Sequence, residues 1–260
     1  MRQAARLRAL VIGCAVVSSA CETVPVTGRS QLQLVSPAEE VQMGESAYKE
    51  ILGKATISSD ASANALVTRV GTRIAGATGR GDLPWEFKVI DDPKTVNAFA
   101  LPGGKVAVYT GILPIARDDA GLAAVLGHEV AHVLAHHSAE RVSQQLAMQQ
   151  IAQMAGSTMG VNAQVVQMGS SLLVAAIQLP WGRSQESEAD HLGLIYMAKA
   201  GYDPHAARDL WIRMSQLAQG ASRPPEWLST HPSEETRIRQ IDGWMPEAMQ
   251  QYHPPPSPPR

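Results

Sequence analysis

An almost wholly apolar run occupies residues 121–127, and the first charged side chain after it is that of Glu129. Asp118 and Asp119 precede the run, and an aspartate at such a position can cap the N-terminus of a helix. A helix that is apolar on every side is normally buried in the interior of a protein. The pattern therefore predicts a helix that begins near Asp119 and passes through the core.

Alternating apolar and polar positions at residues 85–90 and 105–110 predict two short strands, and the second follows a turn signal at residues 102–104. Ser36, followed by a proline and two glutamates, predicts the start of an earlier helix. Helix-forming residues dominate from Asp119 onward. We therefore expect an α+β fold that is dominated by helices, with a small sheet beside the buried helix. That sheet is either an ordinary packed hairpin or an edge to which an extended peptide can add.

The buried helix carries the string H-E-x-x-H at residues 128–132. Two histidines four residues apart lie on one helical face, about 5–6 Å apart, and their imidazoles can bind one Zn²⁺ at about 2.0–2.1 Å each. Glu129 can act as the general base toward the water that attacks a carbonyl group. The pattern could arise by chance, and a single buried histidine could simply be hydrogen-bonded within the core. Burial of all three polar side chains is costly, however, unless a partner such as a metal ion binds them. The string therefore predicts one catalytic zinc ion per chain, held by His128 and His132.

A catalytic zinc normally takes three protein ligands, so a third one is needed. His136 continues the histidine stripe, but on a continuous helix its Cα would lie about 12 Å along the axis from that of His128. Neither Ala135 nor Ser138 predicts a helix break like the one at the glycine of H-E-x-x-H-x-x-G-x-x-H. We therefore expect His136 and His137 to lie around the site or to support a ligand, not to bind the ion.

The acid-rich segment at residues 183–191 offers better candidates for the third ligand. Glu186 and Asp190 are four residues apart and share a helical face, so one could bind the ion while the other orients a histidine. Glu188 points about 160° away from Glu186 on a helix. It is therefore the weaker candidate, and its removal is expected to spare the metal. Taken alone, the segment could equally be a charged surface helix.

These motifs stand with three further strings: T-V-P-V-T-G-R at residues 23–29, N-A-F-A-L-P-G-G at 97–104 and T-H-P at 230–232. Together, over roughly residues 22–240, they resemble the HtpX-like and CAAX-prenyl-endopeptidase-type zinc metallopeptidases of metallopeptidase family 48, and within them the short bacterial lipoprotein members. The resemblance implies a zincin-like fold of the gluzincin type. It makes the first glutamate of the E-x-x-A-D pattern, Glu186, the third zinc ligand, and Asp190 the acid that orients a ligand. The chain departs from the family in having Gly182 where a serine is frequent.

His231, in the T-H-P string, keeps three interpretations open. It could be a loop histidine without a catalytic part. It could donate a hydrogen bond to the tetrahedral oxyanion, a kind of contact whose loss costs about 2.7–4 kcal/mol. It could also place its neutral imidazole where the water binds and hold the resting enzyme shut.

The N-terminus resembles a bacterial secretion signal, with three arginines before an apolar stretch at residues 9–17. Both cysteines of the chain lie here, so a disulfide or a cysteine nucleophile is not expected in the mature protein. Cleavage before Cys14 would leave five apolar residues after Arg8, fewer than the roughly 7–15 of a signal peptide. Cleavage before Cys21 leaves a region of suitable length, and we therefore choose Cys21 as the lipidated residue.

The domain plan that follows has four parts. Residues 1–20 are the lipoprotein signal peptide, and residues 21–36 are the lipidated cysteine and an extended tether. Residues 37–243 are the metallopeptidase domain, and residues 244–260 are a proline-rich flexible tail. The methionine-rich stretch at 144–179 within the domain is either core or a movable lid, and we favour core.

Composition agrees with one catalytic domain. The 260 residues carry a net charge of −2, which gives no general reason to expect nucleic acid, and 45% of them are hydrophobic. No apolar stretch after residue 22 reaches about 18 residues, so no membrane-spanning helix is expected in the mature chain. We expect a lipid-anchored endopeptidase that faces the periplasm, on the outer more than the inner membrane, and acts on misfolded or unassembled envelope proteins. The alternative is an assembly factor or holdase with the same fold and little dependence on hydrolysis.

Overall fold

The computed structural model describes residues 21–24, 27–154, 173–175, 178, 180–220, 225–231 and 235–254. The predicted signal peptide and most of the methionine-rich stretch lie outside these residues. The described elements follow one another as β1 (Cys21–Thr23), β2 (Ser30–Leu32), α2 (Pro37–Lys54), α3 (Ala61–Ala77), β3 (Glu86–Ile90), β4 (Ala98–Leu101), β5 (Lys105–Tyr109), η1 (Thr110–Ile112), α4 (Leu113–Ala116), α5 (Asp119–Leu134), α6 (His137–Met154), α8 (Arg183–Lys199), α9 (His205–Gly220), α10 (Glu226–Thr230) and α11 (Glu235–Gln251).

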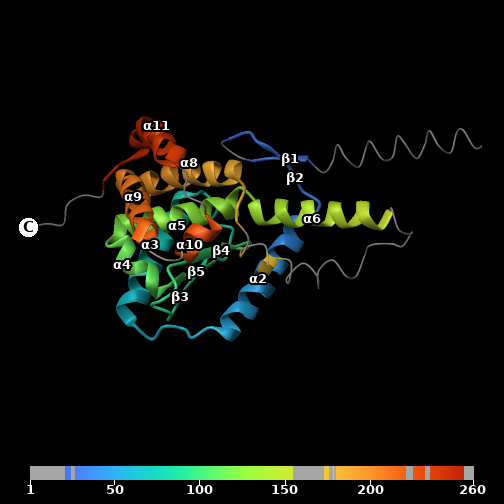
Figure 1. Cartoon of the computed structure of the whole chain (residues 1–260), viewed down its shortest axis with the longest axis horizontal. Coiled ribbons are helices and arrows are strands. Elements are labelled where there is room, and N and C mark those ends of the chain that lie inside the picture. The colour runs from blue at the N-terminus through green and yellow to red at the C-terminus, as the bar shows by residue number, and fades with distance from the viewer. Residues whose placement is uncertain are drawn as a thin grey trace, which may run out of the picture.

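Helices dominate the structure, and one three-stranded sheet lies beside the central helix α5 (Figure 1). On the other side of α5 runs α8, and this pair makes the most extensive contact between elements. The predicted helix starts are confirmed. Ser36 caps α2 in a capping box with Glu39, and the carboxylate of Asp118 accepts a hydrogen bond of 2.8 Å from the N–H of Gly121 at the start of α5. The expected fold class, α+β with a zincin-like catalytic core, is therefore confirmed.

The sheet has the order β3-β5-β4. β3 and β5, the two strands predicted from alternation, pair in parallel and are not a hairpin. The hairpin is formed instead by β4 and β5, which pair antiparallel across the turn at residues 102–104. All four residues of β4 are buried, so β4 lacks the alternation that marks a strand with one wet face. In the sheet, β4 is an edge strand, and it packs on α5.

Helix α5 is buried along nearly its whole length, as its apolar sequence predicts. It packs on the sheet, on α3, on α8 and on α9. Leu122, Val125 and Val130 are completely buried. Each fully buried aliphatic side chain contributes about 1.5–3 kcal/mol relative to exposure. The rigid core helix is therefore a firm base for the H-E-x-x-H residues that it carries.

The helix breaks immediately after this motif, where no break was expected. α5 ends at Leu134, His136 adopts a left-handed conformation with φ of 54°, and α6 begins at His137. The side chain of His136 turns toward α2, where its Nδ1 lies 2.8 Å from Oε2 of Glu40. This contact explains how a non-glycine residue holds a positive φ, which normally disfavours a side chain. The prediction of a continuous helix through this region is wrong.

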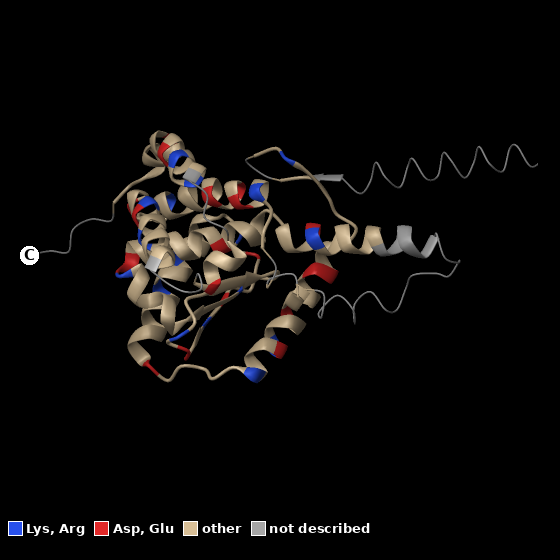
Figure 2. Ribbon diagram, in the orientation of Figure 1, with Lys and Arg blue, Asp and Glu red and all other residues tan. Residues whose placement is uncertain are grey.

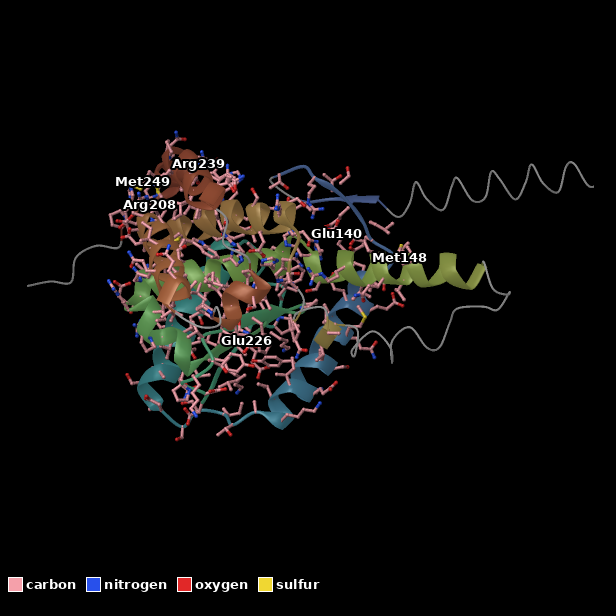
Figure 3. All side chains as sticks on the ribbon, viewed as in Figure 1. Glu140, Met148, Arg208, Glu226, Arg239 and Met249 are labelled. Atoms are coloured by element: carbon pink, nitrogen blue, oxygen red, sulfur yellow. The ribbon has the colours of Figure 1, made fainter. Side chains whose placement is uncertain are left out.

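Two predicted boundaries also differ from the structure. α11 continues to Gln251, and Met245 and Ala248 are buried, so residues 244–251 belong to the folded domain and not to a tail. The expected tether instead includes the paired strands β1 and β2. Met148 lies on the part of α6 that projects from the body and is 69% exposed, so it is not a core residue (Figure 3).

Acidic and basic residues are interspersed along the outer helices (Figure 2). Among the described residues, every helix is too short or too polar to cross a membrane.

Candidate metal centre

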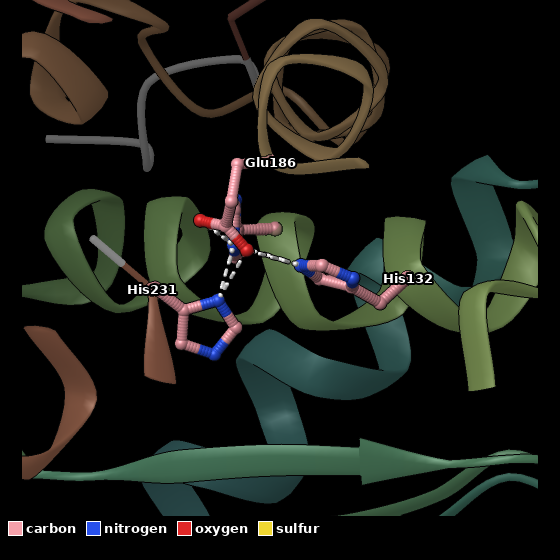
Figure 4. A group of neighbouring side chains, drawn as sticks. His132, Glu186 and His231 are labelled. Carbon is pink, nitrogen blue, oxygen red and sulfur yellow. Dashed lines mark hydrogen bonds and ion pairs between the residues drawn. The ribbon is translucent and has the colours of Figure 1, made fainter. Parts of the chain in front are cut away.

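Four buried side chains converge at the middle of α5: His128, His132, Glu186 and His231. Their candidate ligand atoms all lie within 4.8 Å of one another. Nε2 of His128 is 3.1 Å from Nε2 of His132 and 3.1 Å from Nδ1 of His231. Oε1 of Glu186 is 2.9 Å from His231 Nδ1 and 3.3 Å from His132 Nε2 (Figure 4). The structure thus brings together the three expected ligands and adds His231 as a fourth member.

A close approach of two glycines allows α8 to deliver Glu186 to α5. A Cβ at Gly193 would lie 2.8 Å from the backbone nitrogen of His128, and a Cβ at Gly127 would lie 2.9 Å from the carbonyl oxygen of Gly193. Neither distance leaves room for a side chain. The two helices therefore pack backbone to backbone at the level of the site, as they can only where both residues are glycine.

Carboxylate and imidazole partners orient the two histidines of α5. Nδ1 of His128 lies 2.9 Å from Oδ1 of Asp190, which leaves Nε2 directed at the cluster. Nδ1 of His132 lies 2.8 Å from Nδ1 of His137, and Nε2 of His137 lies 3.0 Å from Oε2 of Glu188. Such partners select the tautomer that leaves the opposite nitrogen free for a metal. Asp190 and His137 thus lie where residues supporting a ligand are expected.

Glu188 supports the site indirectly, through a histidine, which the sequence did not predict. It lies outside the four-residue cluster, in agreement with its weak candidacy as a ligand, but it is buried and holds His137. Burial raises the pKa of this carboxyl group, yet hydrogen bonds from His137, Thr27 and Arg29 outweigh burial and lower the pKa to about 2. Because His137 is the partner of His132, we now expect removal of Glu188 to disturb the site, in place of the expectation that it spares the metal.

Glu129 lies next to the cluster without joining it. Its Oε1 accepts a hydrogen bond of 2.9 Å from the indole N–H of Trp227 and lies 3.4 Å from Nε2 of His231. The backbone of Trp227 also accepts a 2.7 Å hydrogen bond from the N–H of His231. The short helix α10 therefore positions both the general-base candidate and the fourth member of the cluster.

Arg237 on α11 is a central residue of the site that no sequence motif singled out. Its buried guanidinium donates to Oε2 of Glu186 at 2.7 Å and to both carboxylate oxygens of Asp190. It also lies over the ring of Trp211, 3.4 Å from the ring centroid. One cation thus holds the carboxylate of a candidate ligand and the carboxylate that orients another. Its signal in the sequence is weak, because an arginine in an amphipathic helix is ordinarily a surface residue.

The electrostatics of the cluster favour a cation. Burial lowers the pKa of His132 and of His137 and so favours their neutral forms. Burial also opposes charge on His231, but Glu186 and Glu129 outweigh it and raise the pKa of this ring. Burial would raise the pKa of Glu186, but the positive charges at His231 and Arg237 hold it well below the ordinary value. An ionised Glu186 beside the imidazole of His132, whose pKa burial lowers, offers the carboxylate and ring-nitrogen ligands that a zinc ion takes.

The distances agree with this interpretation. Ligand atoms at the corners of a tetrahedron with bonds of about 2.0–2.1 Å lie roughly 3.3 Å apart. In five of the six residue pairs of the cluster, the nitrogen–nitrogen or nitrogen–oxygen separation is 2.9 to 3.7 Å. Unprotonated ring nitrogens at these separations repel each other unless a cation lies between them. The residues present therefore fit a tetrahedral metal ion.

A cavity of about 300 Å³ opens on one side of this cluster. Residues of the edge strand β4 form one wall, so an edge that pairs with no other described strand lies beside the candidate general base. Such an arrangement can hold an extended peptide by strand addition. The cavity is lined by Ile51, Asn97, Ala98, Phe99, Ala100, Tyr109, Glu129, His132, Gln178, Trp181, Glu226, Ser229, Thr230 and His231.

Comparisons with known proteins agree with the site. Residues 61–245 match the sequence profile described as Peptidase family M48. The chain is 42% identical over 230 residues to "Mitochondrial metalloendopeptidase OMA1" of Schizosaccharomyces pombe, a match that covers 87% of this chain and 67% of that protein. It is 30% identical over 250 residues to "Metalloendopeptidase OMA1, mitochondrial" of Homo sapiens, covering 88% of this chain and 46% of that protein.

A bacterial protein is also similar. The chain is 27% identical over 229 residues to "Beta-barrel assembly-enhancing protease" of Escherichia coli (strain K12), covering 85% of this chain and 47% of that protein. Matches thus span two thirds of the fission-yeast protein and about half of the other two.

Proposed function

Because the chain belongs to peptidase family M48, we propose that it is a zinc-dependent endopeptidase of the bacterial envelope whose ion is held by His128, His132 and Glu186. Family membership confirms the resemblance at the level of metallopeptidase family 48 and the expected class of enzyme. We assign the chain further to the HtpX-like, short lipoprotein group on its N-terminal motifs. The observation that carries the proposal is the buried cluster with Glu129 at its side.

Each residue of the site has a proposed task. Zinc, when bound, supplies Lewis-acid chemistry and lowers the pKa of water. Glu129 accepts the proton of the attacking water and passes it to the leaving amine. Asp190 and His137 fix the rings of His128 and His132. Trp227 holds the carboxylate of Glu129 in place through its indole N–H.

His231 is proposed to close the resting site. With it, four side chains surround the position of the ion, whereas a catalytic zinc keeps one position open. Its imidazole must therefore leave before a water molecule and a peptide enter. After leaving, it can still lie near the oxyanion, so closing the site and donating to the transition state are compatible roles.

We propose unfolded or unassembled envelope proteins as substrates, reached from a lipid anchor at Cys21 that faces the periplasm. Two observations support this: the strand edge beside the site suits an extended chain, and one relative is named for β-barrel assembly. Glu22 follows the anchor position, where aspartate is the usual signal for retention in the inner membrane. The absence of that aspartate favours the outer membrane.

The purified protein with Zn²⁺ tests the proposal on unfolded casein. We expect cleavage by the wild type and a loss of about 10²-fold or more in kcat for Glu129→Gln, the range for removal of a general base. Glu247→Gln, an exposed carboxylate that contacts His191, is the control and keeps full activity. Equal cleavage by wild type and Glu129→Gln would contradict the proposal.

A cellular experiment separates the protease from the holdase. Envelope proteomes of wild-type and Glu129→Gln cells are compared for proteins that accumulate uncleaved. If Glu129→Gln cells are indistinguishable from wild type while a deletion strain is impaired, the holdase interpretation replaces the endopeptidase.

A further inference from the structure

The N-terminal strand pair contacts helices that flank the metal centre. β1 and β2 pair antiparallel, and the turn between them is closed by hydrogen bonds between Val24 and Arg29 at 2.8 Å and between Gly28 and Val24 at 3.0 Å. Further along, the N–H of Leu34 donates to Oγ of Ser143 on α6 at 2.9 Å. This segment therefore packs on α6, contacts α8 through Arg29 and is not a free tether (Figure 1).

Arg29 joins the strand pair to two buried carboxylates. Its Nε donates to Oε2 of Glu188 at 2.7 Å, and its Nη1 donates to Oε1 of Glu140 at 2.9 Å. Glu140 lies at the start of α6, directly beside the strand pair (Figure 3), and its other oxygen accepts from Gln185 of α8 at 2.8 Å. The hydroxyl of Thr27 donates to the second oxygen of Glu188. One arginine thus fastens α6, α8 and the strand pair together.

From Glu188 a continuous path of contacts reaches the candidate ligand. A carboxylate only accepts hydrogen bonds, so Nε2 of His137 is the donor in its 3.0 Å contact with Glu188. The other ring nitrogen of His137, Nδ1, lies 2.8 Å from Nδ1 of His132. These two contacts fix the orientation of both rings, with Nε2 of His132 directed at the cluster. Glu188 thus positions a candidate ligand through His137.

We propose that Arg29 is a positioning residue of the metal centre, which fixes Glu188 and through it His137 and His132, so that docking of the strand pair is required for full metal affinity. The inference rests on the proposed function in one respect, that the cluster binds a metal ion, and does not depend on peptide cleavage. Arg29 lies eight residues after Cys21, the proposed anchor. Undocking of the strand pair would therefore weaken the centre without touching a ligand.

A second arginine offers a matched control. Arg69 of α3 binds Asp119 at the start of α5 through two nitrogens, with contacts of 2.8 and 3.2 Å. Arg69→Ala therefore also removes an arginine–carboxylate contact between elements of the same protein. Asp119 lies at the N-terminal end of α5 and contacts none of the cluster residues in these bonds.

The test measures metal binding directly. Full-length wild type, Arg29→Ala, Arg29→Lys, Glu188→Gln, Arg29→Ala/Glu188→Gln and Arg69→Ala are titrated with Zn²⁺ against a chelator. Loss of an outer partner of a ligand typically costs about 10–100-fold in metal affinity. We expect a loss of about 10-fold for Arg29→Ala, partial recovery in Arg29→Lys, and no change in Arg69→Ala. The double variant should bind no worse than Glu188→Gln, because both substitutions interrupt one path.

The visible spectrum of Co²⁺-substituted protein and the thermal midpoint of metal-free protein complete the experiment. A changed Co²⁺ spectrum in Arg29→Ala, absent from Arg69→Ala, supports positioning of a ligand. If Arg29→Ala lowers only the thermal midpoint while zinc affinity and Co²⁺ spectrum equal those of wild type, Arg29 is structural and the inference is overturned. If wild type binds zinc but cleaves no peptide, the proposed function fails while the affinity series still decides this inference.

Discussion

Some single residues of this site have two electrostatic roles, and Glu186 is the clearest case. Its carboxylate is a candidate ligand, yet it also accepts a 2.7 Å hydrogen bond from the buried Arg237. Glu186→Ala should therefore abolish metal binding and also remove one of the two carboxylates that Arg237 binds. Breaking a buried ion pair costs of the order of 3 kcal/mol. Metal analysis and denaturant unfolding of Glu186→Ala, with Glu247→Ala as the exposed control, measure both effects.

For His231, the direction of the change in kcat on substitution distinguishes the two proposed roles. If its ring closes the resting site, His231→Ala should raise kcat on a short unstructured peptide while zinc is retained by the other three side chains. A lower kcat with retained zinc would instead assign it only as a donor to the oxyanion. Kinetics equal to wild type would leave it as a loop histidine without either task.

The candidate site could be predicted from sequence where its residues are close together in the chain. H-E-x-x-H and E-x-x-A-D are short strings whose spacing on a helix carries the chemistry. Arg237 lies 51 residues along the chain from its partner Glu186, and Trp227 lies 98 residues from its partner Glu129. No spacing rule links residues so far apart. For Glu188, helical geometry correctly predicts that it points away from Glu186. Local sequence does not predict that the N-terminal strand pair contacts Glu188 on that face.

Among the elements, the α5–α8 contact sets the geometry of the centre. A methyl group at Gly193 would meet the backbone nitrogen of His128 at 2.8 Å, so Gly193→Ala must push the helices apart. We expect a loss of about 1–3 kcal/mol in the free energy of unfolding and weaker zinc binding. Gly243→Ala in α11, where the added carbon meets nothing within 4 Å, is the matched control and should be neutral or slightly stabilising.

The capping box of α2 predicts a dependence on pH. Hydrogen bonds from the side chain and backbone of Ser36 lower the pKa of Glu39. A carboxyl group with a lowered pKa in the folded state stabilises that state above the ordinary pKa, and the contribution is lost as the pH falls through the lowered value. Ser36→Ala should therefore cost about 1 kcal/mol at pH 7, and its difference from wild type should shrink below pH 4.5, the ordinary value for glutamate. Urea unfolding at several pH values measures this; a difference that stays constant into acid would contradict it.

The elements themselves were more predictable than their pairing. The starts of α2 and α5 follow local capping rules, and both are found where expected. The parallel pairing of β3 with β5 depends on β4, whose residues are all buried and show no alternation. The break at His136 depends on its contact with Glu40 of α2. Both features arise from tertiary contacts, which local patterns do not encode.

For the whole molecule, the centre lies where the sheet, α5, α8, α10 and α11 meet, so metal binding should stabilise the entire domain. A ligand present at 100 times its Kd stabilises the folded state by about 2.7 kcal/mol. Removal of zinc with a chelator should lower the midpoint of thermal unfolding, and added zinc should restore it. Glu186→Ala should show no response to either treatment, and an identical midpoint with and without zinc in wild type would contradict a site at the core of the fold.

The indole rings around the centre give the protein an optical property. Trp211 and Trp227 stack with ring centroids 4.7 Å apart and planes within 18°. Trp227 is bonded to Glu129, while Trp181 lies 4.6 Å from the ring of His132. Three of the five tryptophans in the chain therefore emit from the immediate surroundings of the site. Ultraviolet fluorescence and near-ultraviolet circular dichroism can thus follow the opening and filling of the centre in real time, in unlabelled protein.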